Sequence, residues 1–76
     1  MTPDQKVKRA FPDSEWEWYY TSNPNGTTSY LAIVFTAGRT VLGQAMNHSL
    51  TLAQQKAYKK ASKHPHVVGW HQRKGE

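Results

Sequence analysis

The sequence predicts an α+β fold, in which a three-stranded antiparallel sheet packs on a C-terminal helix and a short helix precedes the sheet. Three observations predict it. Alternating apolar residues run from Tyr30 to Phe35 and resume at Thr40–Leu42, after the glycine-containing turn Thr36–Arg39. A strand-like aromatic segment at 15–21 precedes this hairpin, and an alanine repeat at 53–61 follows it. A hairpin alone is marginal in water, so helices must cover one of its faces. We expect the 76 residues to form one small domain.

The first element is expected to be an amphipathic helix of about two turns. Thr2 can cap it, and Pro3 suits the first helical position. Val7 and Ala10 then fall on one face, and Pro12 ends the helix.

The segment at 15–21 has the composition of a strand, followed by an exposed loop at 22–28 that is rich in turn formers. Alternation places Trp16, Trp18 and Tyr20 on one face and Glu15, Glu17 and Tyr19 on the other. We expect the face with the tryptophans to be core, since large aromatics dominate small cores. If it faces solvent instead, it is a platform for base stacking or a protein hot spot.

The last helix begins at a capping-box pattern, Thr51 to Gln54, with Ser49 as the alternative cap. Its alanine stripe consists of Ala53, Ala57 and Ala61, which predicts close packing on the sheet. Large sheet residues are expected to fill the space that the alanines leave: Leu31, Ile33 and Phe35. Gly43 marks either a bulge or a close approach of another backbone.

The segment 64–66 breaks this helix because of Pro65. The apolar residues that follow, Val67–Trp70, suit a short fourth strand or a packed tail, and both alternatives stay open.

Composition limits the function. Ten Lys and Arg against five Asp and Glu give a net charge of +5, which favours polyanionic partners. There is no cysteine and no apolar stretch long enough for a membrane span, so we expect a cytoplasmic protein without disulfides or thiolate metal sites. With few acids and no triad-like serine, we expect no enzyme, no cofactor and no catalytic residue. The pair His64 and His66 lacks sulfur and carboxylate partners, so we expect no metal site.

The candidate binding residues are mostly cationic. The last helix carries Lys56, Lys59, Lys60 and Lys63 without a balancing acid, which suits either a phosphate-binding face or a solvated surface. We add loop and turn residues and the two first aromatics of the strand: Asn25, Arg39, Trp16 and Trp18.

The helix-β-β-β-helix order resembles the double-stranded RNA-binding domain over residues 3–62. The best local match is Gly43–Ala57, which is similar to that family's glycine in its third strand, serine before its last helix and spaced alanines. The family grips phosphates with lysines at positions that are Leu50, Thr51 and Gln54 here, so the lysine motif is missing. In size and texture the chain also resembles small phage-encoded inhibitors, including anti-CRISPR proteins.

We therefore expect a non-enzymatic module that binds nucleic acid, double-stranded RNA or DNA, through its basic helix face. The alternative is a small inhibitor that blocks a host protein or nucleoprotein complex. Exposed backbone on an edge strand also makes a homodimer possible.

Overall fold

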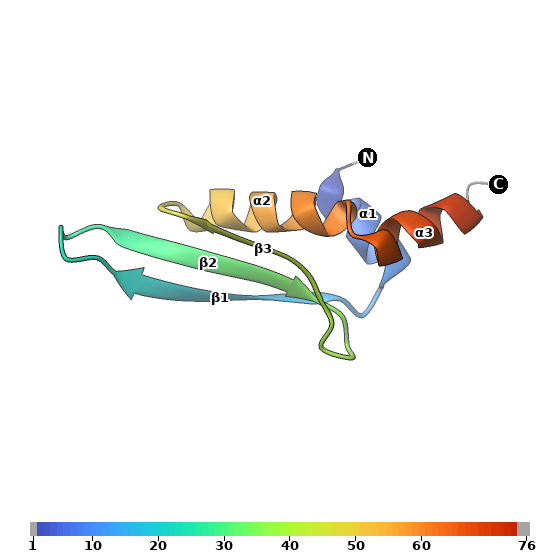
Figure 1. The fold of residues 1–76 in the computed structure, drawn as a ribbon, viewed down its shortest axis with the longest axis horizontal. Coiled ribbons are helices and arrows are strands. Elements are labelled where there is room, and N and C mark those ends of the chain that lie inside the picture. Colours follow the sequence, from blue (N-terminus) through green and yellow to red (C-terminus); the bar gives the residue numbers. More distant parts are fainter. Residues whose placement is uncertain (1, 75–76) are drawn as a thin grey trace.

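The computed structural model describes residues 2–74, and the side chains of residues 2–69. In chain order its elements are α1 (Pro3–Ala10), β1 (Glu15–Ser22), β2 (Thr28–Phe35), β3 (Val41–Asn47), α2 (Leu50–Ser62) and α3 (Pro65–Lys74). The strands form one antiparallel sheet in the order β1-β2-β3, which confirms the predicted α+β fold. Helix α2 lies along one face of the sheet, and α1 and α3 gather at the end away from the β1–β2 loop (Figure 1).

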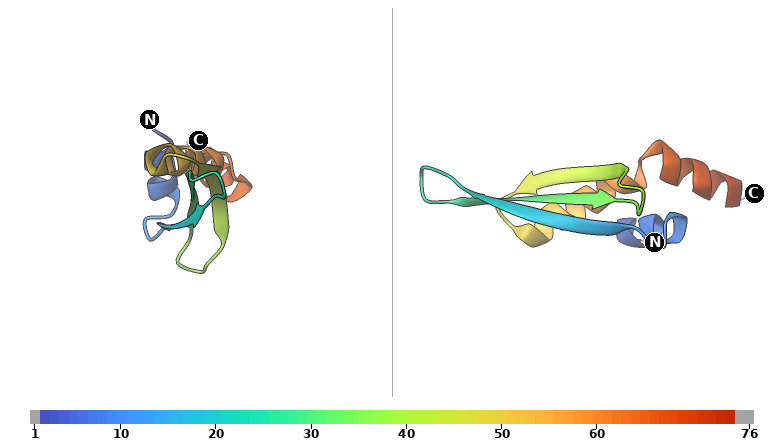
Figure 2. Two further views of the ribbon diagram at one scale, coloured as in Figure 1. Left: turned by 90° about the vertical axis from the view of Figure 1, so that its left-hand side faces the viewer. Right: turned by 90° about the horizontal axis from the view of Figure 1, so that it is seen from below.

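The molecule is elongated, with principal extents of 51 × 23 × 16 Å. The β1–β2 hairpin loop and helix α3 lie at opposite ends (Figure 2), and this loop extends past the first turn of α2. The helix-facing row of the sheet follows from the strand register and consists of Trp16, Trp18, Tyr20, Tyr30, Ala32, Val34, Gly43 and Ala45.

The prediction that Leu31, Ile33 and Phe35 lie beneath the alanine stripe is wrong. These three residues occupy the opposite face of the sheet and are half-buried, whereas Ala32 and Val34 are fully buried under α2. The reason is the short distance between the alanine stripe and the strand residues that face it, which favours small side chains such as Ala32 and Ala45.

Gly43 shows how short that distance is. A Cβ atom added to Gly43 would lie 2.5 Å from the Ala57 carbonyl oxygen and 2.6 Å from the Ala61 backbone nitrogen. The β2–β3 register also shifts between Val34 and Phe35, next to this glycine. Both predictions for Gly43, a bulge and a close backbone approach, are confirmed.

The prediction that the tryptophan face of β1 is core is right only at one end. Trp16 is half-buried and packs against the core, but Trp18 is 47% exposed and Tyr20 is 67% exposed. Helix α2 packs on β2 and β3, and it leaves most of β1 uncovered.

The helix starts follow the local sequence. The backbone amide of Thr2 donates to the side chain of Gln5, and α1 begins at Pro3 as predicted. For α2 the alternative cap is the right one, because Ser49 Oγ accepts a hydrogen bond from the Leu52 amide at 3.4 Å.

Of the two alternatives for Val67–Trp70, the fourth strand is wrong, because these residues belong to the helix α3, which packs against α1 and α2. Pro65 ends the path of α2 and stands at the first position of α3, where its missing N–H costs nothing. Val67 is fully buried, so tertiary packing overrides the β preference of this segment.

Candidate nucleic-acid interface

The exposed flank of α2 carries the lysines that the sequence singled out. The alanine stripe of α2, Ala53, Ala57 and Ala61, is fully buried against the sheet. Lys56, Lys59, Lys60 and Lys63 follow each other at i, i+3, i+4 and i+7, so they share a face of the helix that the alanines cannot occupy. Over these positions the helix rises by roughly 10 Å.

These lysines line one groove. It has a volume of about 450 Å³ and lies between α2 and β3. Ala45 and Met46 line its strand side, and all four lysines line its helix side. We call this hollow the lysine groove. Strand β3 is an edge strand of the sheet, so the groove is open along that edge. The fold therefore converts a periodic sequence pattern into one cationic channel.

No carboxylate neutralises the lysine groove within the described side chains. None of the four lysines forms a side-chain hydrogen bond or an ion pair there, and α2 contains no acid. Asp13, Glu15 and Glu17 instead line a separate cavity of about 480 Å³ at the start of β1. Three of the carboxylates of the described chain therefore lie apart from the lysine groove.

Arg39 lies at the cavity lined by Glu15 and Glu17, and not in the lysine groove. It lies in the β2–β3 turn with a positive φ of 64°, and it lines the same cavity as Glu15 and Glu17. The structure therefore does not bring Arg39 together with the four lysines.

Asn25 lies at the β1–β2 loop, and its side chain is used within that loop. Its Oδ1 atom accepts hydrogen bonds from the Thr27 amide at 3.2 Å and from the Thr27 hydroxyl at 2.7 Å. Asn23 adds hydrogen bonds to Thr27 and Ser29, and Gly26 adopts a positive φ of 86°. The loop is held by its own side chains, and it reaches beyond α2 (Figure 1).

Trp18 contacts two aromatic neighbours: Tyr20, which the sequence placed on the same strand face, and Tyr30, which the sequence analysis did not connect with it. Its ring centroid lies 6.2 Å from that of Tyr20 and 6.2 Å from that of Tyr30. Tyr20 and Tyr30 are directly opposite in the antiparallel register. That pair could have been found by counting back from the 23–27 loop, because a hairpin's turn fixes which residues face each other. Trp16 lies apart from this cluster, against the core.

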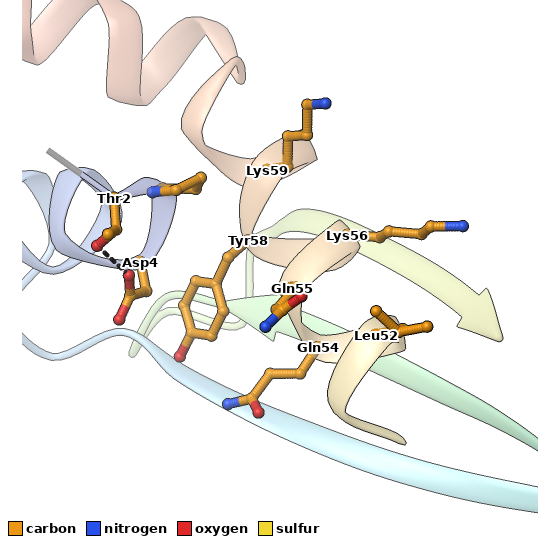
Figure 3. Close-up of a pocket in the computed structure, with 9 residues that line it drawn as sticks. Thr2, Asp4, Leu52, Gln54, Gln55, Lys56, Tyr58 and Lys59 are labelled. Atoms are coloured by element: carbon orange, nitrogen blue, oxygen red, sulfur yellow. Dashed lines mark hydrogen bonds between the residues drawn. The ribbon is translucent and has the colours of Figure 1, made fainter. Parts of the chain in front are cut away.

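A second cavity, of about 560 Å³, lies on another side of α2, next to the start of α1. Its lining includes Lys56 and Lys59, which it shares with the lysine groove, and also Gln54, Tyr58 and Asp4 (Figure 3). Figure 3 shows Tyr58 and Gln54 pointing to one side of α2, while Lys56 and Lys59 point away from them. Lys56 and Lys59 therefore lie on the crest of α2 between the lysine groove and this cavity.

Burial raises the pKa of the Tyr58 hydroxyl above its usual range, and the Asp4 carboxylate raises it further, while a hydrogen bond with Gln54 acts in the opposite direction. On the open face of the sheet, Tyr19 donates a hydrogen bond to Glu17 at 2.7 Å, and this bond raises the pKa of Tyr19. Both shifts favour the protonated form of the phenol.

His64 and His66 stack on each other, with ring centroids 5.1 Å apart. Within the described side chains, no group of three or more His, Cys, Asp or Glu residues is arranged to hold a metal ion. In the part of the chain that the structure covers, no helix combines the length and the apolar character that crossing a membrane requires.

No protein-family model, no curated protein and no solved structure matches this chain. The likeness to double-stranded RNA-binding domains is therefore one of topology, a helix, a three-stranded antiparallel sheet and a second helix packed on it.

Proposed function

We propose that this chain is a non-enzymatic nucleic-acid-binding module that holds phosphates in its lysine groove. The observation that carries the proposal is the convergence on one groove, beside an edge strand, of four lysines that have no partner among the side chains of residues 2–69. Lysine ammonium groups bind phosphate as point charges, and the +5 net charge adds long-range attraction for a polyanion.

The arrangement differs from that of the family which the fold resembles. That family places its lysines at the start of the last helix, where this chain has Leu50, Thr51 and Gln54. Here the cations begin at Lys56 and continue to Lys63, just after α2 ends. A double-stranded RNA or DNA backbone would therefore cross the second half of α2 and the β3 edge.

The test is a binding titration with duplex RNA, duplex DNA and single strands at two salt concentrations. If the four lysines contact phosphates, the association constant should fall with a log–log salt slope of about −3 to −4 on duplex DNA. That slope corresponds to a loss of roughly a hundredfold between about 50 and 200 mM salt. Binding that does not change with salt would contradict the proposal.

A charge-reversal pair isolates the groove. The double variant K59E/K60E should lower affinity for every nucleic acid by more than about tenfold, because it replaces two attractions by two repulsions. Its matched control is R9E/R39E, which changes the net charge equally on exposed residues outside the groove. The control variant should lose only the part of the affinity that comes from long-range attraction, which is smaller. If both variants lose the same affinity, the binding surface does not lie in the lysine groove.

A protein partner is the second candidate, as expected of a small inhibitor that covers a protein surface. The observation that favours it is the open face of the sheet, where Val41 and Met46 are 49% and 62% exposed beside the half-buried Ile33. Apolar patches of this kind often mark protein contacts. If no nucleic acid binds at either salt concentration, this candidate replaces the first.

A further inference from the structure

Three rings form a cluster on the helix side of the β1–β2 hairpin, in which Tyr30 is half-buried against the core and the other two rings are exposed. Trp18, Tyr20 and Tyr30, named here the aromatic platform, are joined by two ring contacts with centroid separations of 6.2 Å. The planes are tilted by 34° between Trp18 and Tyr20 and by 52° between Trp18 and Tyr30. Two of these side chains are largely open to solvent, with exposed fractions of 47% for Trp18 and 67% for Tyr20.

The platform is open because α2 does not cover it. Helix α2 packs on β2 and β3, while β1 forms the far edge of the sheet. Near α1 the same row of β1 is closed off, since Trp16 packs against the core. Toward the loop the row emerges from cover, and the hairpin continues past the start of α2 (Figures 1 and 2).

The platform lies level with the lysine groove. Trp18 pairs with Ala32, and Ala32 pairs with Ala45, which lines the lysine groove with Lys56. The rings and the ammonium groups are therefore on two flanks of the same helical segment. Lys56 stands on the crest of α2 that separates them, because it also lines the cavity on the Gln54 and Tyr58 side.

Charge decides from which side a polyanion can reach these rings. The carboxylates of Glu15 and Glu17 lie on the other face of β1, since they alternate with the tryptophans. Lys8 and Arg39 line the same cavity as these two carboxylates, so the cations there are balanced by acids, whereas the lysine groove has four lysines and no acid in its lining. A phosphate chain is therefore attracted more strongly to the helix side, where the platform is. Cations combined with exposed aromatic faces suit a ligand that has phosphates and free base faces.

We propose that the aromatic platform stacks unpaired nucleobases of a single-stranded segment whose phosphates lie on Lys56 and the other lysines of the groove. The inference rests on the proposed function and adds the ligand class to it. In a duplex the base faces are already covered by their neighbours, so only unpaired bases can use the rings.

The test compares a single strand of about 12 nucleotides with a duplex of the same sequence and length, both titrated against the full chain. The variant Trp18→Ala should weaken single-strand binding at least about fivefold, because stacking contributes roughly 1–3 kcal/mol per base. Duplex affinity should change less than about twofold. Trp18→Phe keeps a ring and should recover most of the single-strand affinity.

The matched control is Tyr19→Ala, an equally exposed ring removed from the opposite face of the same strand. It should leave single-strand binding unchanged. A Tyr19→Ala loss equal to that of Trp18→Ala would overturn the inference.

Two further outcomes separate this inference from the proposed function. If K59E/K60E abolishes binding while Trp18→Ala binds single strands like the unmodified chain, the result supports phosphate binding in the lysine groove and contradicts base stacking on the aromatic platform. If Trp18→Ala weakens the duplex as much as the single strand, the rings do not select unpaired bases and the inference fails. A chain that binds neither ligand contradicts both proposals.

Discussion

The two faces of the sheet differ in a way that runs against a common expectation. The face under α2 is built from small residues, such as Ala32, Gly43 and Ala45, while the face without a helix carries Leu31 and Phe35. Small residues on the sheet meet the alanine stripe of α2, so the two backbones come into contact. Close packing, rather than bulk, joins helix and sheet here, since interiors tolerate neither voids nor overlap.

The open face has the opposite properties. Its large side chains, Leu31, Ile33 and Phe35, are only half-buried, and Met46 is 62% exposed. The covered face thus determines stability, and the open face is available for contacts outside the domain. Substitutions on the two faces should therefore have different consequences.

The largest effect is expected at Gly43. A Gly43→Ala substitution places a methyl group within 2.6 Å of backbone atoms of Ala57 and Ala61, and neither atom can rotate away. We expect a loss of about 3 kcal/mol or more in unfolding free energy, enough to unfold much of a domain this small. Denaturant melts followed by circular dichroism measure it.

The control for Gly43 is Gly38→Ala, where the nearest atom to a new methyl group is the Thr36 hydroxyl at an ordinary 3.8 Å. This change should stay within about 0.5 kcal/mol. Similar melting curves for the two variants would show that α2 does not sit as close to β3 as described.

A smaller effect separates two adjacent residues of β2. Val34→Ala removes two methyl groups from a site with 0% exposure, and should cost about 2 kcal/mol. Ile33→Ala removes more atoms but from the half-buried open face, and should cost about 1 kcal/mol. Urea unfolding of both variants at one protein concentration checks the order.

If Ile33→Ala costs more than Val34→Ala, the open face is covered in solution. A stability of Ile33→Ala that rises with protein concentration would then point to a second copy of the chain, because association stabilises by mass action.

The sequence predicts the elements of this fold better than the way they face each other. Alternation in β2 shows that Ile33 and Val34 lie on opposite faces of the sheet. Because the residues of both faces are apolar, periodicity cannot say which face the helix covers. The deciding information lies in the partners: Gly43 and Ala45 pair with Val34 and Ala32, and a small-residue face fits an alanine helix. Side-chain volume matched across layers contains more information than hydrophobicity alone.

The candidate site follows the same rule. Lysines at 56–63 could be placed on one exposed face because helical periodicity is local. The ring contact between Tyr30 and Trp18 depends on the pairing of β1 with β2. The position of Arg39 beside Glu15, and not beside the lysines, depends on the same arrangement of strands. The helix at 65–74 was missed because β-branched residues and a tryptophan follow Pro65, whereas burial of Val67 determines the outcome.

The smallest expected effect concerns Tyr58, the aromatic residue of the buried core within the described side chains. Tyr58 lies on α2 and lines the same cavity as Asp4, on the covered side of the sheet. Burial first, and the Asp4 carboxylate second, raise the pKa of its hydroxyl above the ordinary value of about 10. The folded state therefore favours the protonated phenol.

This shift makes stability depend on pH in a defined direction. The contribution of Tyr58 is fully present below the unfolded-state pKa of about 10, and it is lost as the pH rises through the higher folded-state pKa. Asp4→Asn should lower the pKa of Tyr58 without returning it to its ordinary value, because burial remains. Tyrosinate absorbance during alkaline titration, compared with that of Tyr58→Phe, isolates this group. A Tyr58 that titrates at its ordinary pKa in the unmodified chain would mean that water reaches the covered side, and that the two faces of the sheet differ less than the structure indicates.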